Sequence, residues 1–343
     1  MFEQVADAAR LSVEGGIPAC QVAVAVDGEV VLFEAFGDCT TESRFPIYSA
    51  TKPLVASAVW QLIGDGLLDV SLPVAHYVPE FATNGKDVVT VEQVMLHTGG
   101  FPLAPIRAVE GADRERRLER FAQWRLDWEP GSQFTYHPAA AHWVLAELID
   151  RLRDADYRDV IEQRVTSPLG LPRLLGIPVD EQDGYVEPVI ADDGERWVVD
   201  GLSTPEARAA GVPGGGGIAT AADVVRFHQA FLHDPKGLWD PAVLADAKTN
   251  VRCTFPDPMM NVPVNRSLGL VLAGDDGKHQ LRQGGFGKGC SPGAFGHSGA
   301  HFQYGWTDPA TGVSFSYLNN LVAENMRQAV LTMPVSKAAS IPG

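Results

Sequence analysis

The chain has 343 residues, of which 45% are hydrophobic and 20% are charged, a composition typical of a globular protein with a sizeable core. Its 27 basic and 43 acidic side chains give a net charge of −16, which disfavours nucleic acid and membranes as partners. No apolar run approaches the roughly 18 residues of a membrane span, and the first residues carry no secretory signal. The four cysteines are scattered without metal-type spacing, so we expect reduced thiols and a cytoplasmic protein.

The chain opens with a predicted amphipathic helix over residues 1–10. Two β-rich runs follow, over 20–26 and 29–36. Asp27 and Gly28 separate these runs, and this dipeptide is a strong signal for a tight turn between antiparallel strands. We therefore expect a β-hairpin near the N-terminus.

A serine and a lysine three positions apart follow the hairpin, at the start of a predicted buried helix that reaches Leu62. Positions i and i+3 share one face of a helix, so the Ser49 hydroxyl and the Lys52 amine can meet. A serine hydroxyl becomes nucleophilic when a base takes its proton, and lysine can be that base where burial or positive charge lowers its pKa. A short motif also arises by chance, and an N-capping serine with a surface lysine is the alternative.

Helical patterns joined by loops rich in proline and glycine occupy residues 64–265. The segment 114–128 is charged and amphipathic, which predicts a solvated surface helix. His97 is expected to stabilise its loop through hydrogen bonds, and Thr220 is a predicted N-cap. The glycines at 214–217 lack the lysine of a phosphate-binding loop, so we interpret them as backbone clearance beside a cleft. The predicted helices of this region cover 88–96, 114–128, 139–152 and 220–232.

Near the C-terminus, hydrophobic residues again recur at every second position, which is the pattern of β-strands. Strands at both ends of the chain therefore enclose a helical middle. We predict an α+β fold with an antiparallel sheet flanked by helices, built from residues 1–63 and 266–343. A mostly helical domain, residues 64–265, is inserted, and the active site is expected in the cleft between the two domains. The predicted late elements are strands over 267–272, 294–299, 302–307 and 312–318 and a helix over 322–331.

Three spaced motifs now stand together: Ser49-x-x-Lys52, Tyr136-His137-Pro138 and His297-Ser298-Gly299. This combination resembles the penicillin-recognising serine hydrolases, especially class C β-lactamases and the esterases and D-aminopeptidases of that superfamily. The loop at 97–102 and the segment 213–223 look like the same family. The resemblance covers nearly the whole chain in the family's order, and it implies a β-lactamase/transpeptidase-like fold.

The resemblance implies a role for each matching residue. Ser49 matches the acylated nucleophile, and Lys52 matches the residue that holds and deprotonates it. Tyr136 matches the tyrosine that shares the general-base work and protonates the leaving group. The oxyanion hole of the family corresponds to the backbone N–H groups of Ser49 and Ala300.

Two departures from the β-lactamase pattern bear on the substrate. Pro138 replaces the asparagine that contacts the acylamino chain of a β-lactam, so efficient cephalosporin hydrolysis is not expected. His297 replaces the lysine of Lys-Thr-Gly, and a neutral histidine offers less to a substrate carboxylate. The sequence therefore favours neutral esters or amides. The predicted substrate-binding residues are His137, His297, Ser298, Gly299 and His301.

We predict a carboxylesterase-like serine hydrolase that forms an acyl-enzyme with a small ester or amide substrate. An acyltransferase and a D-amino-acid peptidase or amidase use the same acyl-enzyme and remain open alternatives. A weak β-lactamase ranks below them because of Pro138 and His297. A non-catalytic binding protein also ranks below them, because Ser49, Lys52 and Tyr136 are all retained. We expect no cofactor and no metal site, since the nine histidines lack ligand spacing. The sequence does not define the oligomeric state.

Overall fold

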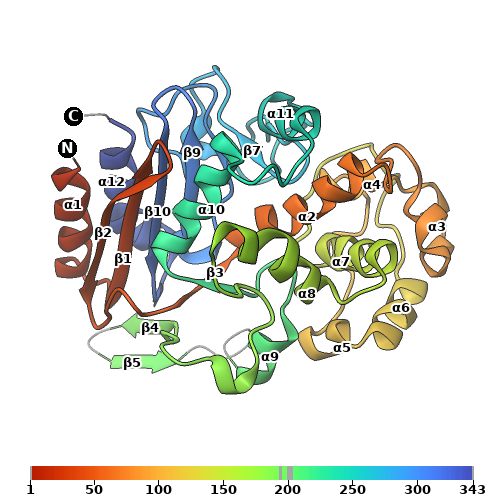
Figure 1. Cartoon of the computed structure of the whole chain (residues 1–343), viewed down its shortest axis with the longest axis horizontal. Coiled ribbons are helices and arrows are strands. Elements are labelled where there is room, and N and C mark those ends of the chain that lie inside the picture. The colour runs from red at the N-terminus through yellow and green to blue at the C-terminus, as the bar shows by residue number, and fades with distance from the viewer. Residues whose placement is uncertain (1, 193–194, 199–203, 342–343) are drawn as a thin grey trace.

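Strands from both ends of the chain form one six-stranded sheet in the computed structural model, which describes residues 2–192, 195–198 and 204–341. The strand order is β2-β1-β10-β9-β8-β7, and every neighbouring pair is antiparallel. Figure 1 shows the C-terminal strands lying beside the N-terminal hairpin. The strands are β1 (Ala19–Val26), β2 (Glu29–Gly37), β7 (Val271–Leu272), β8 (Phe295–Gly296), β9 (Tyr304–Asp308) and β10 (Val313–Asn319).

Strand β1 joins the two halves of this sheet. Asp27 and Gly28, with φ of 50° and 91°, connect it to β2 through the tight turn that their residue types favour. On its other edge β1 pairs with β10 in an unbroken register over residues 20–26. The predicted hairpin and the predicted α+β fold with an antiparallel sheet are confirmed.

Helices cover both faces of the sheet and fill the middle of the sequence. In Figure 1, α1 and α12 lie on one face of the sheet and α10 lies on the other. The α-helices are α1 (Glu3–Glu14), α2 (Lys52–Gly64), α3 (Val74–Tyr77), α4 (Val91–Met95), α5 (Ala108–Ala112), α6 (Arg114–Gln123), α7 (Ala140–Arg153), α8 (Tyr157–Ile161), α9 (Pro205–Ala210), α10 (Ala221–His233), α11 (Pro241–Thr249) and α12 (Asn325–Ala339).

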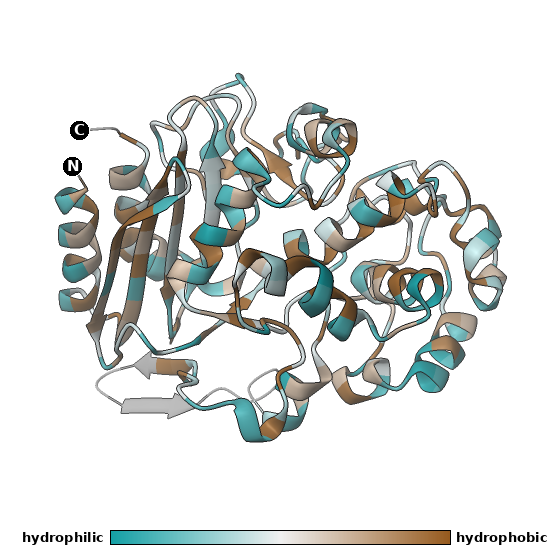
Figure 2. Cartoon of the chain, in the orientation of Figure 1, coloured by the Kyte–Doolittle hydropathy of each residue, from teal (hydrophilic) through white to brown (hydrophobic). Residues whose placement is uncertain are grey.

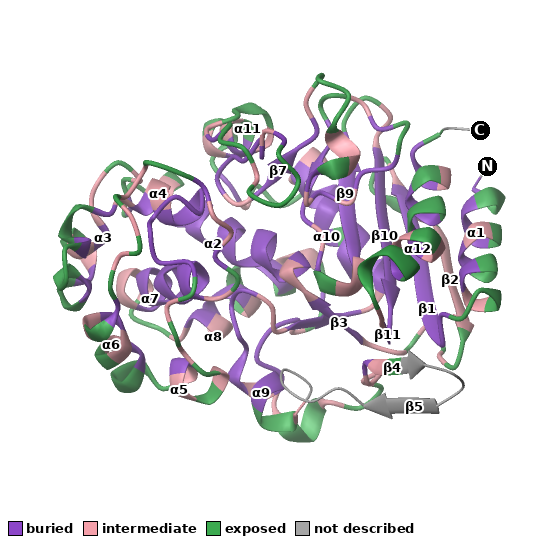
Figure 3. Ribbon diagram, turned by 180° about the vertical axis from the view of Figure 1, so that it is seen from behind, coloured by how far each residue is buried: buried purple, intermediate pink, exposed green. Residues whose placement is uncertain are grey.

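Alternate side chains of β1 belong to two different cores, because successive residues of a strand point to opposite faces. Val22 and Val24 pack in the cluster that includes residues of α1 and α12. Ala23 and Ala25 pack in the larger cluster with residues of α10 and α2. The small alanine side chains allow α10 to lie close to the sheet, and the purple layer in Figure 3 marks these buried elements.

Helix α2 runs through the interior and carries the Ser-x-x-Lys lysine at its first position. Its residues from Lys52 to Leu62 are all buried, as predicted for this helix. Figure 2 colours the ribbon of each element by residue hydropathy, and the leucine, valine and isoleucine residues of α2 are at its brown end. Trp60 anchors it to the late part of the chain, because its Nε1 donates to the Leu268 carbonyl over 2.8 Å.

The described residues also form two smaller sheets. Strand β3 leads directly into the Ser49 turn, and its partner β6 follows the glycine-rich segment. The small sheets pair β3 (Phe45–Tyr48) with β6 (Gly217–Ala219), and β4 (Val189–Asp192) with both β5 (Glu195–Val198) and β11 (Leu321–Val322).

The last helix differs from its predicted extent of 322–331. Leu321–Val322 forms β11, and α12 begins after it and continues through Pro334. A proline inside a helix removes one backbone hydrogen bond. The helix is tied to the sheet just beyond the proline, where Trp306 Nε1 donates to Ser336 Oγ over 3.0 Å.

The predicted solvated helix over 114–128 is present as a mostly exposed surface helix, α6, and it departs from the prediction at two points. The helix ends at Gln123, and Arg117 on it is only 1% exposed. Arg117 Nη2 lies 2.8 Å from Glu147 Oε2 and also pairs with Asp150, both on α7. Arg117 therefore meets buried carboxylates of a neighbouring helix, whereas Glu115, Arg116 and Glu119 on the same helix are exposed to solvent.

The division into a domain of residues 1–63 and 266–343 and an inserted domain of residues 64–265 stays a prediction. Helix α10 belongs to the second range in sequence, yet it packs against the sheet.

Across the described ranges, no helix combines the length and the apolar composition needed to cross a bilayer.

Candidate active site

Ser49 begins a single 3₁₀ turn, Ser49–Thr51, between strand β3 and helix α2. Tyr48 before it has φ 45° and ψ −130°, a conformation that non-glycine residues rarely adopt. Thr51 holds this turn, because its Oγ1 donates to the Tyr48 carbonyl over 2.6 Å and accepts from the Gly217 amide over 2.9 Å. The turn leaves Ser49 half-buried at the N-terminal end of a buried helix.

The Lys52 amine lies beside Ser49 and is enclosed by backbone carbonyls. Its Nζ is 3.2 Å from Ser49 Oγ, 2.9 Å from the Pro138 carbonyl oxygen and 2.6 Å from the Gly214 carbonyl oxygen. A neutral amine has two N–H donors and one lone pair. When the two carbonyls accept these donors, the lone pair is left for the Ser49 hydroxyl.

Gly214 makes this enclosure possible. A Cβ at this position would lie 2.6 Å from the Pro138 carbonyl oxygen and 3.4 Å from Lys52 Nζ. Backbone clearance is the role that we expected for the glycines at 214–217, and at Gly214 this expectation is confirmed.

The surroundings of Lys52 favour its neutral form. The side chain is 1% exposed. Burial, and secondarily the positive charge of Arg266, lowers the pKa of Lys52 well below its usual value of 10.5. Both effects shift the Lys52 amine toward the neutral form that a general base requires.

Tyr136 lies beside two basic side chains. Lys52 Nζ lies 4.9 Å and Arg266 Cζ lies 5.1 Å from the centroid of its ring. Its hydroxyl oxygen is buried, and it has no aligned hydrogen-bond partner among the described residues, although Ser49 is close to it. Burial raises the pKa of Tyr136 to about 12, and both Arg266 and Ser49 oppose that rise. Tyr136 is therefore a protonated donor at neutral pH.

The segment that follows β8 lies directly against the strand that leads to Ser49. A Cβ on Gly299 would lie 2.1 Å from the Ile47 carbonyl oxygen, so only glycine permits this approach. Two residues later, the ring of His301 lies 5.3 Å from the ring of Tyr48, measured between centroids. The backbone of Ala300 is thereby brought to the side of the Ser49 turn.

His297 is buried with both ring nitrogens engaged. Its Nδ1 lies 2.8 Å from the Ser298 carbonyl oxygen, and its Nε2 lies 3.3 Å from Arg266 Nη1. Because a guanidinium only donates, Nε2 accepts and the ring proton resides on Nδ1. Burial lowers the pKa of His297 well below its usual range, so the ring is neutral. Ser298 Oγ donates to the Gln283 carbonyl over 2.8 Å.

His137 points away from the reacting groups. Its Nδ1 lies 2.6 Å from the Thr135 carbonyl oxygen, and its Nε2 accepts from the Phe101 amide over 3.2 Å. The His137 amide in turn donates to His97 Nδ1 over 3.1 Å, a bond of the kind predicted for His97. Since backbone groups occupy both ring nitrogens of His137, we leave this residue out of the substrate-binding set proposed below.

Two side chains beside the site belong to no sequence motif and were not predicted as site residues. Arg266 contacts the Tyr136 ring and His297, yet it stands alone before a predicted strand and belongs to no motif. His142 on α7 is buried beside His97, with a ring-centroid distance of 6.0 Å, and neither of its ring nitrogens has a hydrogen-bond partner within the described residues.

The described part of the chain contains no group of three His, Cys, Asp or Glu side chains arranged to hold a metal ion.

The fold and the serine–lysine–tyrosine cluster together define the class of the penicillin-recognising serine hydrolases. The chain belongs to the beta-lactamase family, whose model matches residues 3–339.

Comparison with individual proteins extends this assignment. The chain is 27% identical over 319 residues to the esterase/beta-lactamase LipL of Mycobacterium tuberculosis, a match that covers 82% of this chain and 70% of LipL. It is 28% identical over 249 residues to the esterase EstB of Burkholderia gladioli, and the match covers 60% of this chain and 61% of EstB. A penicillin-binding protein homologue from Caulobacter crescentus has the same fold, with a TM-score of 0.81, 24% identity, and coverage of 98% of this chain and 96% of that one.

Proposed function

We propose that this chain is a serine hydrolase that acts through an acyl-enzyme on small, neutral carboxylic esters. One observation carries the proposal: the Lys52 amine is buried, its two N–H donors face carbonyl oxygens, and its Nζ lies 3.2 Å from Ser49 Oγ. An amine in this position can remove the serine proton as the hydroxyl attacks a carbonyl carbon.

The first step forms the acyl-enzyme. Ser49 Oγ bonds to the substrate carbonyl carbon while its proton passes to Lys52 Nζ. The amides of Ser49 and Ala300 are the proposed donors to the resulting oxyanion. As the tetrahedral intermediate collapses, the bond to the alcohol breaks and Tyr136 gives its proton to the leaving oxygen.

The second step releases the acid. The Tyr136 phenolate, next to the positive charges of Lys52 and Arg266, takes a proton from water. The hydroxide attacks the acyl carbon, the bond to Ser49 Oγ breaks, and Lys52 returns its proton to the serine. Every group then has the protonation state with which it began.

The preference for neutral substrates rests on Pro138 and His297. The carbonyl of Pro138 is already used by Lys52, and its side chain has no amide to offer an acylamino group. His297 is neutral, and its Nε2 faces Arg266. The remaining substrate-binding candidates are Ser298, Gly299 and His301, beside the Ser49 turn. Two relatives of this chain are named esterases, in keeping with this substrate class.

Acyl transfer and hydrolysis of a D-amino-acid amide use the same acyl-enzyme and remain the second candidates. A structure described as a D-stereospecific amidohydrolase shares this fold, at 18% identity. The cluster described above does not distinguish an alcohol from an amine as leaving group, so the substrate has to be determined by experiment.

Intact-mass spectrometry after reaction with p-nitrophenyl butyrate tests the proposal, with Ser49→Ala as the matched variant. We expect turnover and a butyryl adduct on Ser49 in the wild type and neither in the variant. Equal turnover by both proteins would refute the mechanism. Adding methanol then separates the two fates of the acyl group, because a transferase yields methyl butyrate where a hydrolase yields butyrate.

A further inference from the structure

Arg266 is a buried cation without a carboxylate partner. Its side chain is only 2% exposed, and it makes no ion pair with any described residue. Its Nη1 donates to His297 Nε2 over 3.3 Å, its Nη2 donates to Gln283 Oε1, and its Nε has no partner in the described part of the chain. All hydrogen-bond acceptors of this guanidinium are neutral, so no paired carboxylate compensates its positive charge.

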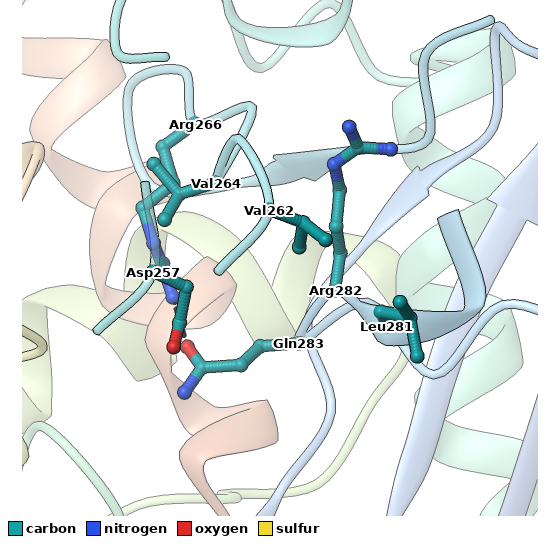
Figure 4. Close-up of a pocket in the computed structure, with 7 residues that line it drawn as sticks. All are labelled: Asp257, Val262, Val264, Arg266, Leu281, Arg282 and Gln283. Carbon is teal, nitrogen blue, oxygen red and sulfur yellow. Dashed lines mark hydrogen bonds between the residues drawn. The ribbon is translucent and has the colours of Figure 1, made fainter. Parts of the chain in front are cut away.

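The neighbouring Arg282 provides a contrast. It lines the same small pocket, and its Nη2 is paired with the Asp276 carboxylate. Figure 4 shows its guanidinium extending away, whereas Gln283 points toward Arg266 with Asp257 beside it. Burying an unpaired charge costs far more than burying a paired one. Stability by itself therefore gives no reason for the arrangement at Arg266.

The uncompensated charge lies next to the reacting groups. Arg266 Cζ is 5.1 Å and Lys52 Nζ is 4.9 Å from the Tyr136 ring centroid, so the two charges are at most about 10 Å apart. At this separation, and at an effective dielectric constant near 20, two positive charges still repel each other, so Arg266 disfavours the protonated form of Lys52. Burial of the region keeps solvent screening small.

We propose that Arg266 is a positioning residue whose uncompensated charge keeps Lys52 in its neutral, base-competent form and prepares Tyr136 to give up its proton. This inference rests on the proposed function. A charge from a loop segment before β7 thereby acts at the site although His297, where β-lactamases carry a lysine, is itself neutral. Arg266 also fixes the tautomer of His297, because its donor occupies Nε2.

The other titratable groups near Lys52 do not supply this charge. The histidines around it are buried, and burial lowers the pKa of each below its usual range. Asp257 is the acid that acts on Arg266 from the pocket side, and it forms no ion pair with it. The titratable and charged groups that face Lys52 or Arg266 are His97, Tyr136, His137, His142, Cys253, Asp257 and His297.

The test is the pH dependence of Ser49 labelling by a fluorophosphonate, which needs no knowledge of the natural substrate. Ser49 Oγ bonds to phosphorus, fluoride leaves, and the hydroxyl proton passes to Lys52. Labelling rates would be measured from pH 5 to 10 for the wild type, Arg266→Gln and Gln283→Glu. The second variant keeps Arg266 and places a carboxylate against it. The controls are Arg266→Lys, which keeps a charge, and Arg252→Gln, at a guanidinium already paired with Asp246 and Glu92.

Removing the charge should let Lys52 hold its proton at higher pH. The acid limb of the labelling profile is the pH range over which the labelling rate rises. We therefore expect this limb to shift to higher pH by about one pH unit in Arg266→Gln. Gln283→Glu should move it in the same direction, and the two controls should not move it.

Coincident acid limbs in the wild type, Arg266→Gln and Gln283→Glu would overturn the inference, even if melting temperatures fell, because a structural role lowers stability without moving the limb. If Ser49 is not labelled in the wild type, the proposed function itself fails. The two failures are thus distinguishable.

Discussion

Lys52 and Lys86 make the same local contact, but the two neighbouring hydroxyl groups differ in where their protons go. Both are buried lysines with a hydroxyl three residues earlier: Lys52 Nζ is 3.2 Å from Ser49 Oγ, and Lys86 Nζ is 3.1 Å from Thr83 Oγ1. The Thr83 hydroxyl, however, donates its proton to the Ala122 carbonyl over 2.7 Å. A hydroxyl and an amine at i and i+3 thus do not make a nucleophile unless the hydroxyl proton is free to move to the amine.

Substitution of Lys52 tests its role as a base. Lys52→Met should lower the rate of Ser49 acylation by about 10²- to 10⁴-fold, because no group remains to take the serine proton. Lys52→Arg should lose as much, since arginine keeps a charge but does not deprotonate. Burst kinetics with p-nitrophenyl butyrate measure both. An Lys52→Arg enzyme with a rate near that of the wild type would mean that charge, not proton transfer, is what Lys52 supplies.

The pH dependence of the wild type follows from the same residue. Only neutral Lys52 accepts a proton, so kcat/KM should rise with pH through the pKa of Lys52 and then level off. Because burial and Arg266 lower that pKa, the plateau should begin well below pH 10.5. A rate that continues to rise toward pH 10.5 would show that Lys52 keeps an ordinary pKa.

At the scale of elements, α6 and α7 are joined by buried charge. Arg117 on α6 reaches Glu147 and Asp150 on α7, and its Nη1 donates to the Gly111 carbonyl over 3.0 Å. Arg114 and Arg151 also bind Glu147, so the carboxylate is surrounded by donors. The network ties α6 to the helix that begins directly after the Tyr136 segment.

Removal of the central cation should be costly. Arg117→Met leaves two buried carboxylates without their main partner and should lower the free energy of unfolding by about 3–5 kcal/mol. Arg116→Met is the matched control, because the one ion pair of Arg116 with a described residue is the exposed pair with Asp113, and such pairs contribute about 0–1 kcal/mol. Urea unfolding followed by circular dichroism measures both. Equal losses in the two variants would contradict the role of the buried network.

At the scale of the whole molecule, the overall charge and the charge at the site differ in sign. The chain carries a net charge of −16, whereas the ring of Tyr136 is contacted by Lys52 and Arg266. The site can therefore stabilise developing negative charge inside an acidic protein. The cleft between two domains and a cytoplasmic location remain predictions.

The net charge predicts no affinity for anionic surfaces. In vesicle co-sedimentation at low salt, we expect no more protein with phosphatidylglycerol vesicles than with neutral phosphatidylcholine vesicles, because like charges repel. Electrophoretic mobility shift with duplex DNA should likewise detect no complex. Binding to the anionic vesicles that disappears at high salt would contradict this prediction and point to a local basic surface.

The sequence by itself determined the features that depend on neighbouring residues. The turn at Asp27 and Gly28, the two strands that it joins and the N-cap at Thr220 follow from local chemistry, and the structure contains all three. The order of the motifs was enough to assign the family. These features depend on backbone preference and on the period of the side chains, which a linear pattern records.

Tertiary structure decided which distant groups meet. The carbonyl of Gly214 encloses Lys52 from 162 residues away, and Arg266 brings an unpaired charge to Tyr136 without a motif to mark it. The continuation of α12 through Pro334 and the burial of Arg117 likewise depend on partners elsewhere in the chain. Burial and charge compensation arise only when the chain is folded, because both depend on everything that surrounds a group in space.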